Sequence, residues 1–134
     1  ACIRDFVESL PLGYDTKIGI DGDGLSSGQK QRILISRALA GKPEILILDD
    51  ATSALDLATE AKLQKALREN LKDTTVILIA QRIASVKSAD RIAVLENGTV
   101  RDLGTHDELM KTSETYRDIY RSQMKQIEEG GESK

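Results

Sequence analysis

The chain has little or none of several features that would assign it to a functional class. Its single cysteine, Cys2, excludes an internal disulfide and favours a reducing compartment. Basic residues are not in excess, because 19 Lys and Arg stand against 22 Asp and Glu and give a net charge of −3. This balance argues against general attraction to nucleic acid or to an anionic membrane surface, and we expect no nucleic-acid partner.

Long hydrophobic runs are also missing. No run approaches the roughly 18–20 residues that a membrane-spanning helix needs, and the longest, residues 45–48 and 76–80, have the length of buried strands. The chain opens directly on a helical pattern rather than on a charged and apolar leader. We therefore expect a piece of a longer protein, with at most one domain in its 134 residues.

The patterns that are present alternate between helix and strand. A helix is predicted over about 27–40, where Ser26 and Gln29 have the spacing of a capping box, and another over 57–71. Apolar runs at 44–48 and 75–80 predict two strands buried on both faces of a parallel sheet. A strand, a helix and a strand in this order make a right-handed crossover, so the predicted fold class is α/β.

The last third of the chain predicts a hairpin and two helices. Asn97-Gly98 separates two strand-like runs and favours a two-residue hairpin turn. Thr105 and Glu108 form a second capping box at the start of a short helix, and the only histidine, His106, lies inside it, where a structural role is expected. A final helix with one apolar face, followed by a loose tail at 128–134, completes the pattern; that face carries Tyr116, Ile119, Tyr120 and Ile127.

Two segments carry residue types suited to phosphate chemistry. Asp49 and Asp50 follow a predicted strand, where a carboxylate can hold Mg²⁺ and a second can orient water. Residues 25–29, Leu-Ser-Ser-Gly-Gln, open a helix whose free N–H groups suit an anion. Each segment alone also has an ordinary interpretation, as a strand that ends in acids and as a capped helix.

The order and spacing of these segments resemble the ATP-binding cassette family. Residues 25–29 look like its signature motif, 45–50 like Walker B, and 53–56, Ser-Ala-Leu-Asp, like its D-loop. Residues 79–82 lie where the family has its switch loop. Further matches at 10–16 and 104–109 extend the resemblance from about residue 3 to about residue 124, and they indicate the exporter branch.

The resemblance implies a partial P-loop NTPase-like parallel sheet with part of the family's helical subdomain. Residues 1–40 would belong to the helical subdomain and signature helix, and residues 41–127 would run from Walker B to the C-terminal helices. The implied cofactors are ATP and Mg²⁺, with Asp49 on the metal and with Asp50 and Gln81 at the catalytic positions. The implied nucleotide-binding residues are Leu25, Ser26, Ser27, Gly28, Gln29 and Asp56.

One element of the family is absent from the sequence. A P-loop requires G-x-x-x-x-G-K-[ST], whereas the only Gly-Lys pair, at 41–42, is followed by Pro43. Without this phosphate-binding segment we expect the isolated chain to bind ATP weakly and to be inactive as an ATPase.

Two positions depart from the family pattern. Asp50 stands where the family has a glutamate base, which shortens the side chain by about 1.5 Å, and a misplacement near 1 Å can cost about 100-fold in rate. Gln81 stands where the family has a histidine. Unlike histidine, glutamine cannot take up a proton and become positively charged. The departures predict a degenerate ATP site that binds ATP but hydrolyses it slowly.

These features together predict one subunit of a heterodimeric exporter at the cytoplasmic face of the cell membrane. Its expected partners are a second, non-identical nucleotide-binding domain, whose ATP site the signature segment would complete, and a transmembrane domain. The alternative is a non-hydrolytic nucleotide clamp or regulatory module. A soluble cassette protein of DNA maintenance or translation is disfavoured by the net acidity and by the exporter-like segments.

Overall fold

The computed structural model describes residues 2–131, with side chains for all of these except residues 21 and 126–131. The chain divides into two compact units, residues 1–80 and 81–134. This division follows the second strand. Among the described residues, no helix combines the length and the apolar character that crossing a bilayer requires.

The first unit contains three α-helices, two 3₁₀ turns and two strands. In chain order these are α1 (Arg4–Glu8), η1 (Gly13–Asp15), η2 (Ile20–Gly22), α2 (Ser27–Ala40), β1 (Ile45–Asp49), α3 (Leu57–Asn70) and β2 (Thr75–Ile79).

Both long helices of the first unit begin after a residue whose side chain caps them. The Ser26 hydroxyl accepts a hydrogen bond from the Gln29 N–H, and the Gln29 side chain returns one to the Ser26 N–H, so the predicted capping box is confirmed. Helix α3 is capped by the Asp56 carboxylate, which accepts from the Thr59 N–H at 2.9 Å. These bonds satisfy N–H groups that the first turn of a helix otherwise leaves without acceptors.

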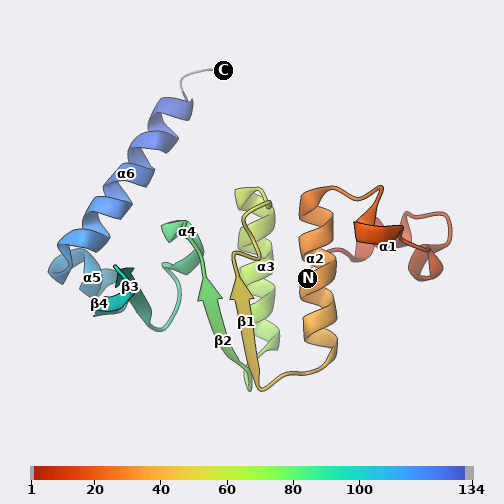
Figure 1. The fold of residues 1–134 in the computed structure, drawn as a ribbon, viewed down its shortest axis with the longest axis horizontal. Coiled ribbons are helices and arrows are strands. Elements are labelled where there is room, and N and C mark those ends of the chain that lie inside the picture. The colour runs from red at the N-terminus through yellow and green to blue at the C-terminus, as the bar shows by residue number, and fades with distance from the viewer. Residues whose placement is uncertain (1, 132–134) are drawn as a thin grey trace. The chain divides into compact units, whose positions relative to one another are not determined.

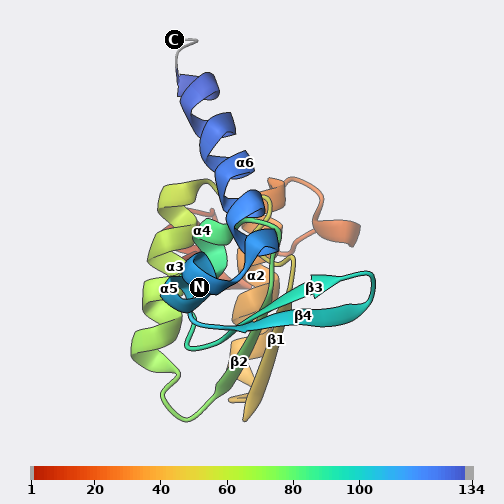
Figure 2. The same ribbon diagram turned by 90° about the vertical axis from the view of Figure 1, so that its left-hand side faces the viewer.

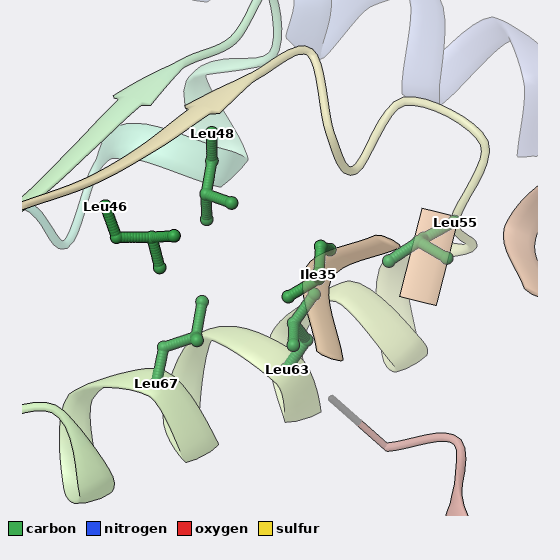
Figure 3. Packing of buried hydrophobic residues seen from close by; sticks show 6 residues of the cluster. All are labelled: Ile35, Leu46, Leu48, Leu55, Leu63 and Leu67. Carbon is green, nitrogen blue, oxygen red and sulfur yellow. The ribbon is translucent and has the colours of Figure 1, made fainter. Parts of the chain in front are cut away.

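Strands β1 and β2 pair in parallel, as predicted, from Ile45 opposite Thr75 to Asp49 opposite Ile79 (Figure 1). One face of the pair packs on the helices, and Figure 3 shows Leu46 and Leu48 of β1 pointing toward α3. The buried cluster consists of Ile35, Leu46, Leu48, Leu55, Leu63 and Leu67.

The prediction that both strands are buried on both faces is wrong for the described residues. Burial alternates along β1, so that Ile45 and Ile47 are each 60% exposed while their neighbours are buried. On β2, Ile77 and Ile79 are 46% and 48% exposed. The apolar runs fit a strand covered on both sides, but helices α2 and α3 contribute to a core on one side only.

The second unit contains three helices and an antiparallel hairpin. Its elements are α4 (Ile83–Val86), β3 (Ile92–Glu96), β4 (Thr99–Gly104), α5 (His106–Thr112) and α6 (Glu114–Gly131). The hairpin turn lies at Asn97 and Gly98, with φ of 51° and 76°, as a two-residue turn with two left-handed residues requires (Figure 2). Thr105 and Glu108 form the second predicted capping box.

A separate apolar cluster stabilises the second unit. It is formed by Ile83, Ile92, Val94, Leu109 and Tyr116, with Tyr120 packed against it. Ile119, which was expected on the same face, is 38% exposed instead, and the side chain of Ile127 lies outside the described residues.

Helix α6 runs to Gly131, so residues 128–131 continue the helix where a loose tail was expected; residues 132–134 lie outside the described part. Glu128 and Glu129 are good helix formers, and the first glycine comes only at position 130.

Candidate functional site

The start of α2 is arranged to receive an anion. Its capping box uses the N–H groups of Ser26 and Gln29, while those of Ser27 and Gly28 have no acceptor within the helix. Ser26 and Ser27 are exposed. An exposed helix start with free N–H groups carries a partial positive charge and suits a phosphate oxygen.

The Gln31 side chain connects α2 to the segment that follows β1. Its amide nitrogen donates to the Ser53 hydroxyl at 3.1 Å and to the Asp50 carbonyl at 3.4 Å. Its amide oxygen accepts from the Ala54 N–H at 3.1 Å. One side chain therefore fixes residues 50–54 relative to the helix that carries residues 26–29.

Asp50 occupies the left-handed region of the backbone, with φ of 47°. This conformation is uncommon for a residue with a side chain, and aspartate is among the few that adopt it. Surrounding hydrogen bonds hold it there: its N–H donates to the Ile79 carbonyl at 3.0 Å, and its carbonyl accepts from the Ser53 N–H and hydroxyl at 3.2 and 3.0 Å. The chain thus turns sharply at Asp50, and its carboxylate stays exposed.

Gly28 approaches the same segment from the helix. A Cβ at this position would lie 3.1 Å from the Ala54 carbonyl oxygen and 3.3 Å from Cδ2 of Leu55. The close approach of α2 to residues 54–55 therefore depends on the missing side chain.

Asp56 is exposed and already engaged as the cap of α3. Hydrogen bonds from the Thr59 side chain and then its backbone lower the pKa of Asp56 below its ordinary value. A lowered folded-state pKa means that the contribution of Asp56 to stability is complete above its ordinary pKa and is lost as the pH falls through the lower value. The carboxylate is therefore charged at neutral pH.

Gln81 belongs to the second unit, where its side chain is exposed. Its backbone carbonyl accepts a hydrogen bond from the Gln123 side chain of α6 at 2.8 Å. The structure thus places Ser26–Gln29, Asp50 and Asp56 in the first unit, where Gln31 links α2 to the turn at Asp50, and it places Gln81 in the second.

The sequence and the fold of this chain are similar to those of known ABC transporter proteins. The ABC transporter family model matches residues 2–53. An uncharacterized ABC transporter ATP-binding protein, YknU of Bacillus subtilis, is 49% identical over 124 residues, which are 92% of this chain and 21% of that protein. The ATP-dependent lipid A-core flippase of Haemophilus influenzae is 46% identical over 119 residues, 89% of this chain and 20% of the flippase.

A solved structure agrees with these matches. A bacterial Atm1-family ABC exporter with ATP bound superposes with a TM-score of 0.85 at 39% identity, covering 90% of this chain and 21% of the exporter chain. The chain is homologous to the nucleotide-binding domains of exporter-type ABC proteins. It has their mixed α/β fold and spans about a fifth of the length of these relatives.

The donor set at the carboxyl end of β1 fits Mg²⁺. Asp49 is exposed at the carboxyl end of β1, where ligands of parallel sheets collect. No cluster of three or more His, Cys, Asp or Glu side chains occurs among the residues the structure describes. Mg²⁺ typically takes one or two protein carboxylates and completes its shell with phosphate oxygens and water, so the single carboxylate of Asp49 suffices for such a site.

His106, the only histidine of the chain, has a structural environment. Its Nδ1 lies 2.9 Å from the Tyr116 hydroxyl, and its ring contacts Tyr116 edge-on. Burial, with the neighbouring Tyr120, raises the pKa of Tyr116 above its ordinary value. This packing between α5 and α6 agrees with the structural role predicted for His106.

Sequence reasoning gave no structural role to three residues that hold the candidate site segments in place. Gln31 and Gln123 act through partners 19 or more positions away, and no local pattern reveals such contacts. Glu60 had a signal, because it lies in phase with the buried Leu63 and Leu67 on α3. Its side chain is 3% exposed and accepts a hydrogen bond from the Thr52 hydroxyl at 2.7 Å.

The contact between Thr52 and Glu60 makes a stability prediction. Thr52→Val removes a hydrogen bond from a buried carboxylate, and we expect the free energy of unfolding to fall by about 1–3 kcal/mol. Urea unfolding of the protein would measure this change. Thr52→Ser keeps the hydroxyl and should cost clearly less; equal losses in the two variants would show that packing of the Thr52 methyl group contributes as much as the hydrogen bond.

Proposed function

We propose that the protein carrying this segment is an ATP-hydrolysing subunit of an ABC exporter, located at the cytoplasmic face of the cell membrane. The observation that carries the proposal is the attachment of the signature segment to the Walker B end. Gln31 ties α2 to residues 50–54 and so links the helix that begins with Ser26–Gln29 to the turn at Asp50. The export functions named for several homologous proteins support this assignment.

Within this proposal each site residue has a role. Asp49 would hold Mg²⁺, which when bound neutralises charge on the phosphates. Asp50 would occupy the position of the catalytic base, and Gln81 would contact the γ-phosphate of ATP. The helix start at residues 25–29, together with Asp56, would face the ATP that is bound by a second, non-identical nucleotide-binding domain. A transmembrane domain would be the other partner.

The division suggested by the family resemblance forms part of the proposal. Residues 1–40 would belong to the helical subdomain and signature helix, and residues 41–127 would extend from Walker B to the C-terminal helices. Since the chain contains no Walker A sequence, we expect its isolated form to be inactive.

A nucleotide clamp without hydrolysis is the second candidate. It is favoured by Asp50 and Gln81, which replace the glutamate and histidine of the family pattern. The two candidates make opposite statements about turnover in the assembled protein. A clamp binds ATP at this subunit and leaves the assembly without steady-state hydrolysis, whereas the first proposal requires a working site on the partner.

Steady-state ATP turnover of the complete assembled protein separates these cases. Ser26→Arg places a bulky cation at the exposed start of α2 and should abolish turnover, because the partner's ATP loses its contact surface. Asp50→Asn should retain most of the turnover if hydrolysis occurs at the partner's site. Ser26→Ala removes only the helix cap and should lower the free energy of unfolding by about 1 kcal/mol. Its loss of ATP turnover should be far smaller than that of Ser26→Arg.

The outcomes decide between the proposals. Equal damage from Asp50→Asn and Ser26→Arg would contradict the degenerate site and make Asp50 a working catalytic carboxylate. ATP binding without any turnover in the unaltered assembly would favour the clamp.

A further inference from the structure

The Gln123 side chain of α6 holds the backbone on both sides of Arg82. Its amide nitrogen donates to the Gln81 carbonyl at 2.8 Å, and its amide oxygen accepts from the Ile83 N–H at 2.9 Å. The two backbone groups lie 42 and 40 positions away along the chain. A single planar amide thus meets one acceptor and one donor of the same loop.

The bond to Ile83 serves as the cap that α4 otherwise lacks. Helix α4 begins at Ile83, and Arg82 at its N-cap position makes no side-chain cap bond. The first N–H groups of a helix need acceptors from outside the helix, and Ile83 is only 4% exposed. An unmet N–H at a buried position costs free energy, so the Gln123 oxygen fixes where α4 starts.

The bond to Gln81 fixes the residue whose side chain carries the proposed function. Because the carbonyl of Gln81 is held from α6, the direction in which its exposed side chain leaves the backbone is also restricted. Gln123 itself is half-buried in the helix and does not belong to any of the motifs that resemble the family.

We propose that Gln123 is a positioning residue through which α6 sets the contact of Gln81 with the terminal phosphate of ATP. The inference rests on the proposed function, because it takes Gln81 as the γ-phosphate contact. It requires both halves of the amide: the oxygen places α4, and the nitrogen orients Gln81.

The affinities for ATP and ADP in the assembled full-length protein test this role. In Gln123→Met the affinity for ATP at this subunit's site should fall about ten-fold. This fold-change corresponds to the free energy of one hydrogen bond to a charged group. The affinity for ADP should change less than about two-fold, since ADP lacks the phosphate that Gln81 would contact. A general loss of structure would weaken both nucleotides alike. Calorimetric titration with each nucleotide gives both values.

Three further variants complete the test. Gln81→Ala identifies the site and should reproduce the ATP-specific loss, and adding Gln123→Met to it should cause no further loss. Gln123→Glu keeps the shape and the acceptor for Ile83 but cannot donate to Gln81, so it should show the same loss with an intact fold. Lys125→Met, an exposed neighbour on α6, is the control and should leave both affinities unchanged.

Each result has a separate meaning. An ATP-specific loss in Gln123→Met and Gln123→Glu supports the inference. An ATP-specific loss in Gln81→Ala alone overturns the inference and leaves the proposed function standing. No effect of Gln81→Ala overturns the role of Gln81 in the proposed function, and the positioning role of Gln123 falls with it.

Discussion

Gly28→Val is expected to lower ATP turnover of the assembled protein by about 100-fold. A Cβ at Gly28 would lie 3.1 Å from the backbone oxygen of Ala54, which cannot rotate away as a side chain could. Valine adds two methyl groups beyond that Cβ, so either the start of α2 or the segment at 54–55 must move. Under the proposed function the start of α2 and Asp56, which directly follows this segment, face the same ATP, and a displacement near 1 Å is enough to cost about two orders of magnitude.

The hydrogen bonds of Gln31 make this displacement harder to absorb. They hold the Ala54 N–H at 3.1 Å and the Asp50 carbonyl at 3.4 Å, so a shift of residue 54 also affects the turn at Asp50. The steady-state rate, measured at saturating ATP, is the appropriate readout.

Gly41→Val is the matched control for this prediction. Gly41 follows α2 with φ of −75°, and a Cβ there would meet its nearest atom, the Ala38 carbonyl oxygen, at an ordinary 3.7 Å. We expect turnover to change less than about two-fold, as for surface substitutions in general. Similar losses from both variants would contradict the steric explanation.

Leu63→Ala is expected to lower the free energy of unfolding by about 2–5 kcal/mol. Leu63 is fully buried in α3 and belongs to the cluster formed with α2 and β1 (Figure 3). Truncation removes Cγ and the two methyl groups from contact and leaves a cavity between elements whose backbones cannot close around it. Urea or guanidinium unfolding of the protein would measure the loss as a lower transition midpoint.

Leu57→Ala provides the same chemical change at the exposed end of the same helix. Leu57 is 55% exposed and is the first residue of α3. The free energy of unfolding should change by about 0.5 kcal/mol or less. A loss at position 57 as large as that at position 63 would indicate that helix propensity, not core packing, determines the effect.

The elements that the sequence predicted best are those determined by neighbouring residues. The start of α2 depends on Ser26 and Gln29, three positions apart, and the hairpin turn depends on Asn97-Gly98 alone. Such local chemistry is visible in the printed sequence. Burial of β1 on one face could not be predicted in the same way, because an apolar strand does not specify which elements cover it.

The candidate site shows the same contrast. Ser26–Gln29, Asp50 and Asp56 stood out because their order resembles that of a known family. The residues that hold these segments in place could not be found from order or spacing. Gln31 reaches Asp50 and Gln123 reaches Gln81 across separate elements, and only the folded chain brings each pair together.

Each of the two compact units is one continuous stretch of the sequence, and this affects how the chain can fold during its synthesis. All buried residues of the first cluster lie before residue 80, so this cluster can close on the ribosome while residues 81–134 are still being added, which takes about 3–11 s at bacterial and eukaryotic elongation rates.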